Sequence, residues 1–104
     1  MRSEVLKGHV DVLLLATLER QPLHGYGVVE RLRETSEGAF DLGEGTVYPA
    51  LYRLESAGLL TSAWMTAEGR RRRVYRLTRR GRRELAAGRR EWKTFSRAVR
   101  TVLA

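Results

Sequence analysis

Apolar side chains recur at alternating steps of three and four residues through the C-terminal part of the chain. These positions, called the seam below, are Leu85, Gly88, Trp92, Phe95, Val99 and Val102. Such a repeat is typical of a helix that packs lengthwise against another helix. Because an isolated helix is only marginally stable in water, the seam needs a partner surface. The sequence therefore predicts a C-terminal dimerisation helix over residues 79–104.

Charge is divided unequally along the chain. Residues 1–69 hold 6 basic and 10 acidic side chains, whereas residues 70–104 hold 14 basic and 2 acidic ones. Nearly all the basic residues are arginines, whose forked guanidinium group suits contacts with phosphate. The whole chain of 104 residues has a net charge of +8. This distribution indicates an anionic partner rather than any particular fold.

Several classes of protein are excluded by what the sequence lacks. It has no cysteine, which excludes a disulfide framework, a thiolate zinc site and a cysteine nucleophile. Its longest apolar run has five residues, 12–16, too short to span a membrane. It has no serine-hydrolase elbow, phosphate-binding glycine loop or zinc-protease helix motif. We therefore expect a small soluble protein that is cytoplasmic and associated with the nucleoid, with no enzymatic activity, no cofactor and no metal.

Two helices are expected near the N-terminus. Residues 5–19 are apolar on most sides and predict a buried helix, which the Gln-Pro-Leu segment 21–23 ends. The His-Gly-Tyr-Gly segment 24–27 leads into a second helix that ends near Thr35. The expected buried face of this second helix consists of Tyr26, Val29 and Leu32.

The third helix has the clearest boundaries. Thr46 is expected to be its N-cap, and Pro49 then falls in the first turn, where a missing N–H disrupts little. Gly58 is expected to end the helix in the left-handed conformation. Its buried stripe is predicted from helical spacing to be Val47, Leu51 and Leu54.

The apolar pattern then changes to the alternation of strands. Residues 61–66 and 71–77 predict two strands joined by a turn at 67–70. Three helices, a hairpin and a last helix follow the order of a winged helix-turn-helix, a mainly α (α+β) fold whose third helix enters the major groove. We therefore expect a DNA-binding domain over residues 1–78, with a two-stranded β wing, followed by the dimerisation helix.

The arginines of the hairpin have two interpretations. They are Arg70, Arg71, Arg72, Arg73 and Arg76. They repel one another and only Glu68 is expected nearby, so contact with a polyanion explains them better than a merely solvated turn. A basic protein that binds RNA or chromatin without sequence preference is the alternative class. That alternative explains neither the seam nor the pattern of the third helix.

Four segments of the chain are similar to a known family. They are residues 24–27, 45–55, 58–60 with Trp64, and 72–78 with Gly81. On these residues, the chain resembles the PadR-like transcriptional regulators over residues 9–92, in the short form with one C-terminal helix. The resemblance implies a homodimeric repressor that binds a pseudo-palindromic operator. Double-stranded DNA and a second copy of the chain are thus the expected partners.

The candidate DNA contacts lie on the third helix and the wing. They are Thr46, Tyr48, Pro49, Tyr52, Arg53, Arg70, Arg71, Arg72 and Arg73. We favour contact with DNA for Tyr48, whereas for Tyr52 contact with DNA and packing against the wing both stay open. Arginines within residues 79–83 oppose the dipole at the start of the last helix. Either phosphate or an acidic surface of the partner subunit would offset that repulsion.

Two further predictions concern aromatic side chains. The resemblance implies that Trp92 and Phe95 stack a planar aromatic effector at the dimer interface, and that its binding releases the operator. The alternative is that Trp92 is only dimer core and that neighbouring side chains fill the space beside Gly88. His24 is expected to fix the start of the second helix by a hydrogen bond rather than to hold a metal.

Overall fold

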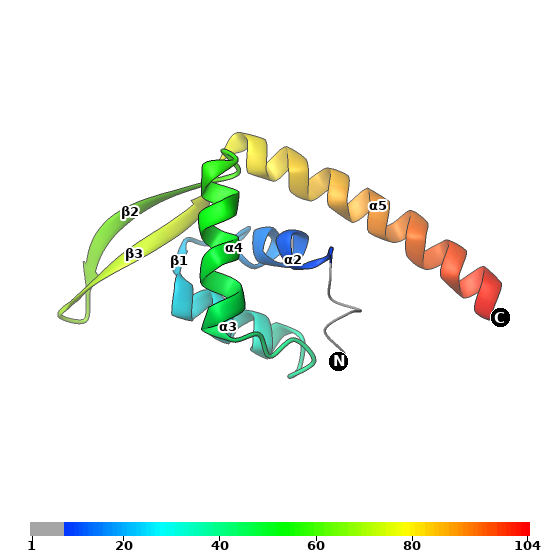
Figure 1. Ribbon diagram of the computed structural model, residues 1–104, viewed down its shortest axis with the longest axis horizontal. Helices are drawn as coiled ribbons and strands as arrows, with labels where there is room; N and C mark the ends of the chain where they lie inside the picture. Colours follow the sequence, from blue (N-terminus) through cyan, green and yellow to red (C-terminus); the bar gives the residue numbers. More distant parts are fainter. Residues whose placement is uncertain (1–7) are drawn as a thin grey trace.

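The computed structural model describes residues 8–104 and shows four helices and a three-stranded sheet over that range. The helices are α2 (Val10–Thr17), α3 (Gly25–Thr35), α4 (Glu44–Ser56) and α5 (Arg79–Leu103). The strands are β1 (Leu23–His24), β2 (Leu60–Ala67) and β3 (Arg70–Leu77). Helices α2, α3 and α4 form a body from which the β2–β3 hairpin and α5 project in different directions (Figure 1). This is the predicted winged-helix architecture.

The first described helix is shorter than the one expected over residues 5–19. Helix α2 ends at Thr17, and residues 5–7 lie outside the described part of the chain. Leu14, Leu15 and Leu18 are its contribution to the core, each at most 3% exposed. Among the described residues, no helix is long and apolar enough to cross a membrane.

Strand β1 was not expected from the sequence. Its two residues pair antiparallel with β3, Leu23 opposite Tyr75 and His24 opposite Val74, which gives the sheet order β1-β3-β2. A two-residue strand is too short to show an alternating pattern. Only the pairing with β3, some fifty residues away in sequence, creates it. The two-stranded wing is therefore the free part of a three-stranded sheet.

His24 also begins α3, as predicted. The Gly27 N–H donates a hydrogen bond to His24 Nδ1 at 3.0 Å, which satisfies one of the free amides at the start of the helix. Burial lowers the pKa of His24, and the charge of Arg72 lowers it further. Both effects favour the neutral imidazole, the form that has a nitrogen able to accept this bond.

The buried face of α3 differs from the prediction at one position. Val29 and Leu32 are buried as expected, at 7% and 4% exposed, but Tyr26 is 44% exposed. Val28 is fully buried in its place. Tyr26 and Val28 lie on either side of the stripe formed by Val29 and Leu32. The packing of neighbouring elements decides which of the two faces the core.

Helix α4 starts three residues earlier than the sequence predicts. Its N-cap is Gly43 rather than Thr46, so Thr46 lies within the first turn and Pro49 in the second. Proline then leaves the Gly45 carbonyl without its helical donor, and both residues are exposed to water. The predicted stripe is confirmed, since Val47, Leu51 and Leu54 are at most 2% exposed.

Gly58 ends α4 as predicted. Its φ is +82°, and the following residue, Leu59, donates its N–H to the Leu54 carbonyl at 3.0 Å. This bond is the closing contact of a left-handed helix end. The chain then enters β2 directly.

The wing is a tight hairpin. Ala67 pairs with Arg70, so the turn has two central residues, Glu68 and Gly69, rather than the four expected. Both have positive φ, at 52° and 74°, as a type I′ turn requires. A turn of this type matches the twist of the two strands and sets their register.

Helix α5 begins inside the body and leaves it. Thr78 caps the helix by accepting from the Gly81 N–H at 3.0 Å, and Leu85 is 2% exposed within the core. Beyond its first turns the helix projects away (Figure 1), and the molecule measures 53 × 28 × 21 Å. The compact unit therefore continues past residue 78 into the start of α5.

Candidate nucleic-acid interface

The exposed side of α4 carries the two tyrosines predicted as DNA contacts. Tyr52 is 72% exposed and Tyr48 is 42% exposed. The Tyr48 ring lies directly over Gly25 of α3, where an added Cβ would be 2.3 Å from a ring carbon. Glycine at this position therefore allows the ring to lie close to the backbone. Thr46 and Pro49 are also exposed on α4.

Arg53 lies on the same helix, but its side chain contacts helix α2. Its guanidinium forms an ion pair with Asp11 of α2. Both side chains are about half exposed, 59% and 47%, so the pair is of the weak surface kind. A phosphate contact by Arg53 would require it to leave Asp11. The sequence did not indicate this pair because its members are 42 residues apart.

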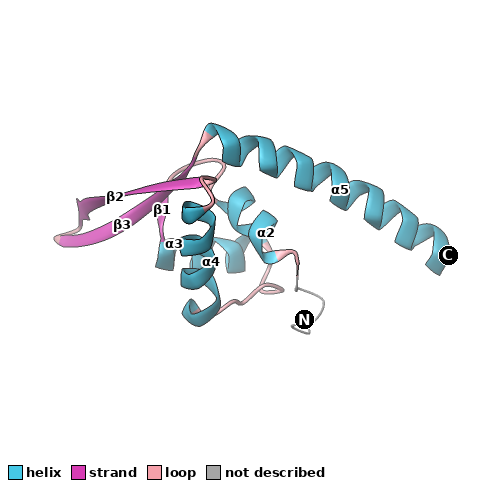
Figure 2. Ribbon diagram, turned by 45° about the horizontal axis from the view of Figure 1, so that its top comes forward, coloured by secondary structure: helices cyan, strands magenta, loops and turns pink. Residues whose placement is uncertain are grey.

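The wing is the hairpin of strands β2 and β3 that projects from the helices (Figure 2), and its two faces carry different side chains. Side chains alternate between the faces of a strand, so the register places Arg71 and Arg73 on the face of Ser62 and Trp64. The other face carries Arg70, Arg72 and Arg76. Of these, Arg72 lies 3.5 Å from His24 Nδ1. The predicted wing arginines are thus brought together, but on opposite sides of one ribbon.

Trp64 is a wing residue that the sequence analysis did not assign to the site. It is 56% exposed, and the guanidinium carbons of Arg71 and Arg73 lie 5.3 and 5.6 Å from its ring centroid. These distances fit cation–π contacts. The pairing register would have revealed the cluster, because Trp64 is directly opposite Arg73.

Arg73 also has acidic and polar neighbours, contrary to the expectation that only Glu68 is near the wing arginines. Its Nε donates to Ser62 Oγ at 2.8 Å, and its Nη2 lies 3.8 Å from Glu55 Oε2. Ser62 Oγ in turn donates to Glu55 Oε2 at 2.6 Å. The base of the wing is therefore linked to α4.

The seam divides into a part used within the chain and a part that is exposed. Leu85 is core, and a Cβ on Gly88 would lie 2.7 Å from Val12 Cγ2, so α2 fills the space beside Gly88. Trp92 and Phe95 are 51% and 56% exposed, with ring centroids 5.9 Å apart and planes at 36°. Val102 is 81% exposed. The place of a side chain at Gly88 is therefore taken by Val12.

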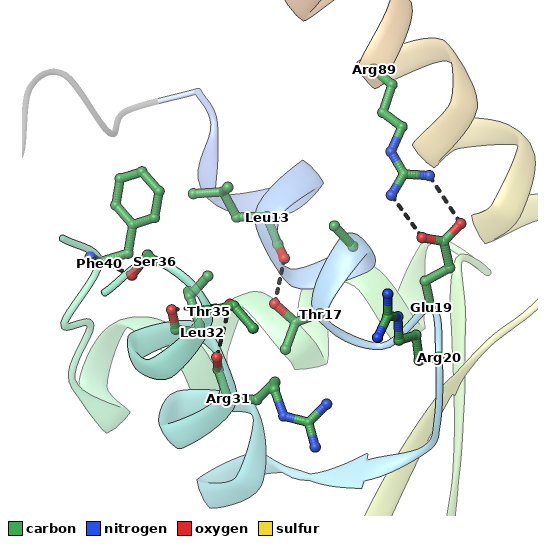
Figure 3. A pocket seen from close by; sticks show the side chains of 11 residues that line it. Leu13, Thr17, Glu19, Arg20, Arg31, Leu32, Thr35, Ser36, Phe40 and Arg89 are labelled. Carbon is green, nitrogen blue, oxygen red and sulfur yellow. Dashed lines mark hydrogen bonds and ion pairs between the residues drawn. The ribbon is translucent and has the colours of Figure 1, made fainter. Parts of the chain in front are cut away.

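A hollow of about 510 Å³ lies between α2, α3 and α5 (Figure 3). At one edge, Arg89 of α5 donates two hydrogen bonds to the Glu19 carboxylate, at 2.7 and 2.9 Å. These bonds lower the pKa of Glu19. The pair ties α5 to the end of α2. Among the described residues, no group of three potential metal-ligating side chains is present.

Comparison with known proteins decides the family. The description of the matching family is "Transcriptional regulator PadR-like family", and the match covers residues 14–87. This stretch runs from the core of α2 through the wing into α5 and includes most of the chain. The chain belongs to the PadR-like family of transcriptional regulators.

Several proteins similar to this PadR-like protein are named as transcriptional regulators. It is 43% identical to transcriptional regulator Rv3488 of Mycobacterium tuberculosis over 67 residues, 64% of this chain. The match spans 63% of that regulator, less than two thirds of its length. A PadR family transcription regulator from Clostridium difficile is 33% identical, with a TM-score of 0.84 over 93% of this chain and all of that one. A regulator from Clostridium thermocellum has a TM-score of 0.88 at 27% identity, covering 97% and 99% of the two chains.

Proposed function

We propose that this PadR-like regulator is a repressor that binds a specific pseudo-palindromic operator as a homodimer on the nucleoid. One observation carries the proposal. The chain has both two exposed tyrosines on α4, Tyr48 and Tyr52, and a wing with four consecutive arginines. Helices of this kind contact base edges, and basic wings contact the backbone. A dimer with two-fold symmetry fits two half-sites about one helical turn apart.

The proposed dimer interface is the C-terminal part of the seam, which consists of Trp92, Phe95, Val99 and Val102. Trp92, Phe95 and Val102 are exposed, Val99 is partly buried, and the Trp92 ring also packs edge-on against His9, 5.5 Å between centroids. Spacing alone also assigned Leu85 and Gly88 to the interface. In the structure, Leu85 is buried in the core of its own chain and Gly88 packs against Val12. Two copies of this apolar face would bury each other. Aromatic residues such as Trp92 and Phe95 are enriched in the buried core of protein interfaces.

Changing Arg71 and Arg72 together to alanine is expected to weaken binding to all duplexes alike. Each lost phosphate contact reduces the slope of log affinity against log salt by about 0.9. Fluorescence anisotropy at several salt concentrations measures both quantities. The matched control replaces Arg97 and Arg100, exposed on α5, and is expected to leave the slope unchanged.

An unchanged slope in the wing variant would place the wing away from the DNA backbone. Equal affinity for single-stranded RNA and for duplex DNA would instead favour the alternative, a basic protein without sequence preference. That alternative still has the charge distribution in its favour. The fold and the family favour the operator-binding regulator.

We propose further that a small planar aromatic effector stacks on Trp92 and Phe95 and lowers operator affinity. Support comes from the two exposed rings, whose separation suits offset stacking. A Trp64→Phe background leaves Trp92 as the sole tryptophan. Phenolic acids and planar cationic dyes at submillimolar concentration are expected to quench its fluorescence. Equal ligand affinity in a Trp92→Ala variant that still dimerises would show that the seam is only structural.

A further inference from the structure

One serine hydroxyl connects three elements at the base of the wing. Ser62 Oγ, on β2, donates to Glu55 Oε2 of α4 at 2.6 Å and accepts from Arg73 Nε of β3 at 2.8 Å. Arg73 Nη2 is also 3.8 Å from the same carboxylate oxygen. We call these three residues the latch. A hydroxyl has one proton to give and lone pairs to accept with, so this bonding pattern uses Ser62 in both roles.

The latch continues along the wing through Trp64. The guanidinium carbon of Arg73 lies 5.6 Å from the Trp64 ring centroid. That of Arg71, two residues nearer the tip, lies 5.3 Å from it. Arg71 has no ion pair with an acid among the described residues. The two arginines on this face therefore differ, since Arg73 is held by a carboxylate and Arg71 is not.

The latch shares a helix stripe with the DNA-facing tyrosines. Tyr48, Tyr52 and Glu55 follow at steps of four and three, the spacing of neighbours on one side of a helix. On β3, the face of Arg73 also carries Tyr75, which is 6% exposed and packs in the core. The latch thus joins the side of α4 that bears the tyrosines to the side of the wing that faces the body.

We propose that Arg73 is a positioning residue, which holds the wing at a fixed angle to α4 through Ser62 and Glu55, while Arg71 supplies the phosphate contact on that face. This inference rests on the proposed DNA-binding function. A two-stranded ribbon that projects from its sheet has little stability of its own. Ordering such a ribbon on binding would lower affinity, whereas a wing held in place beforehand avoids that loss.

The two arginines provide the first test because they occupy the same face and carry the same charge. Arg71→Ala is expected to reduce the salt slope of operator binding by about 0.9, the value for one phosphate contact. Arg73→Ala is expected to lower the affinity and to leave the slope unchanged. A slope reduced equally by both changes would assign Arg73 to the phosphate backbone and overturn the positioning role.

Ser62 provides a test that changes no charge. Ser62→Ala removes both bonds of the latch and is expected to lower operator affinity about three- to tenfold, the lower part of the range for networked side chains. Ser62→Thr keeps the hydroxyl in a residue that suits strands and is expected to restore the affinity. If Arg73 instead contacts phosphate, Ser62→Ala removes the hydrogen bond that holds it at the base of the wing and leaves only its ion pair with Glu55, and the affinity would stay the same or rise.

A measurement without DNA separates this inference from the proposed function. In a Trp92→Phe background, Trp64 is the only tryptophan. Ser62→Ala is expected to increase quenching of Trp64 by acrylamide, because Arg73 then leaves the ring, and Ser62→Thr is not. Unchanged quenching in Ser62→Ala would show that the latch does not order the wing. Failure of the wild-type protein to bind any duplex would remove the proposed function and the positioning role with it.

Discussion

Replacing Phe95 by glutamate is expected to convert the protein from a dimer into a folded monomer. Phe95 is 56% exposed on α5, so the change removes little from the core of the chain itself. In a two-fold dimer it would bury two unpaired carboxylates in the apolar interface. Burying an uncompensated charge costs about 3–5 kcal/mol, which raises the dimer dissociation constant at least about a hundredfold. Sedimentation equilibrium measures the mass directly.

The same variant is expected to lose operator affinity. A monomer contacts one half-site, and the loss of the second contact reduces affinity by about 10²–10⁴. Thr101→Glu is the matched control, because Thr101 is exposed on another side of the same helix and the charge change is equal. A monomeric wild-type protein, or a Phe95→Glu variant that stays dimeric, would contradict the proposed interface.

Substitution is a cleaner test than removing the helix. A chain cut after Gly81 would lose the proposed interface residues of the seam and also its core member Leu85, which is 2% exposed. Loss of a buried leucine side chain alone destabilises a domain by about 2–5 kcal/mol. Such a truncation would therefore report on folding as much as on dimerisation.

Changing Gly81 to alanine is expected to cause a large loss of stability. An added Cβ would lie 2.1 Å from the Leu59 carbonyl oxygen, a backbone atom that cannot turn aside. That carbonyl also accepts from the Thr78 N–H at 3.1 Å, and Thr78 Oγ1 donates to the Gly58 carbonyl at 2.8 Å. Relieving the clash moves the start of α5 and breaks these bonds.

We expect the free energy of unfolding to fall by about 3 kcal/mol, in the range of overpacking with lost hydrogen bonds. For a domain of this size the melting temperature would fall by roughly 12–24 °C. Thermal unfolding at one fixed protein concentration measures the change, since dimerisation contributes to apparent stability. Gly45→Ala is the control, because a Cβ there meets nothing within 4 Å and alanine favours the helix by about 0.5–1 kcal/mol. Equal stabilities for wild type and Gly81→Ala would show that the junction can shift freely.

Features that depend on neighbouring residues were predictable from the sequence. The buried stripe of α4, its glycine end at Gly58, the bond from Gly27 to His24 and the hairpin all follow from local spacing or conformational preference. The long C-terminal helix follows from the seam in the same way. The resemblance on the third-helix segment led to the family that the comparison establishes.

Features that depend on contacts between distant segments were decided only by the tertiary structure. Strand β1 exists because β3 pairs with it, and Arg53 is directed to Asp11 because α2 packs beside α4. The latch joins Glu55, Ser62 and Arg73 across three elements, although the sequence suggested a row of arginines that contact a polyanion.

The seam of α5 depends both on local spacing and on contacts with distant segments. Its spacing determined that α5 has a single apolar side, because side chains three and four residues apart share a helix face. Spacing is identical for Gly88, which lies against Val12 of α2, and for Trp92, which touches only the edge of the body at His9 and is 51% exposed, so it did not separate the two. The packing of Val12 against Gly88 and the end of the body divide the seam into core and exposed face, because burial is set by what the rest of the chain places beside each residue.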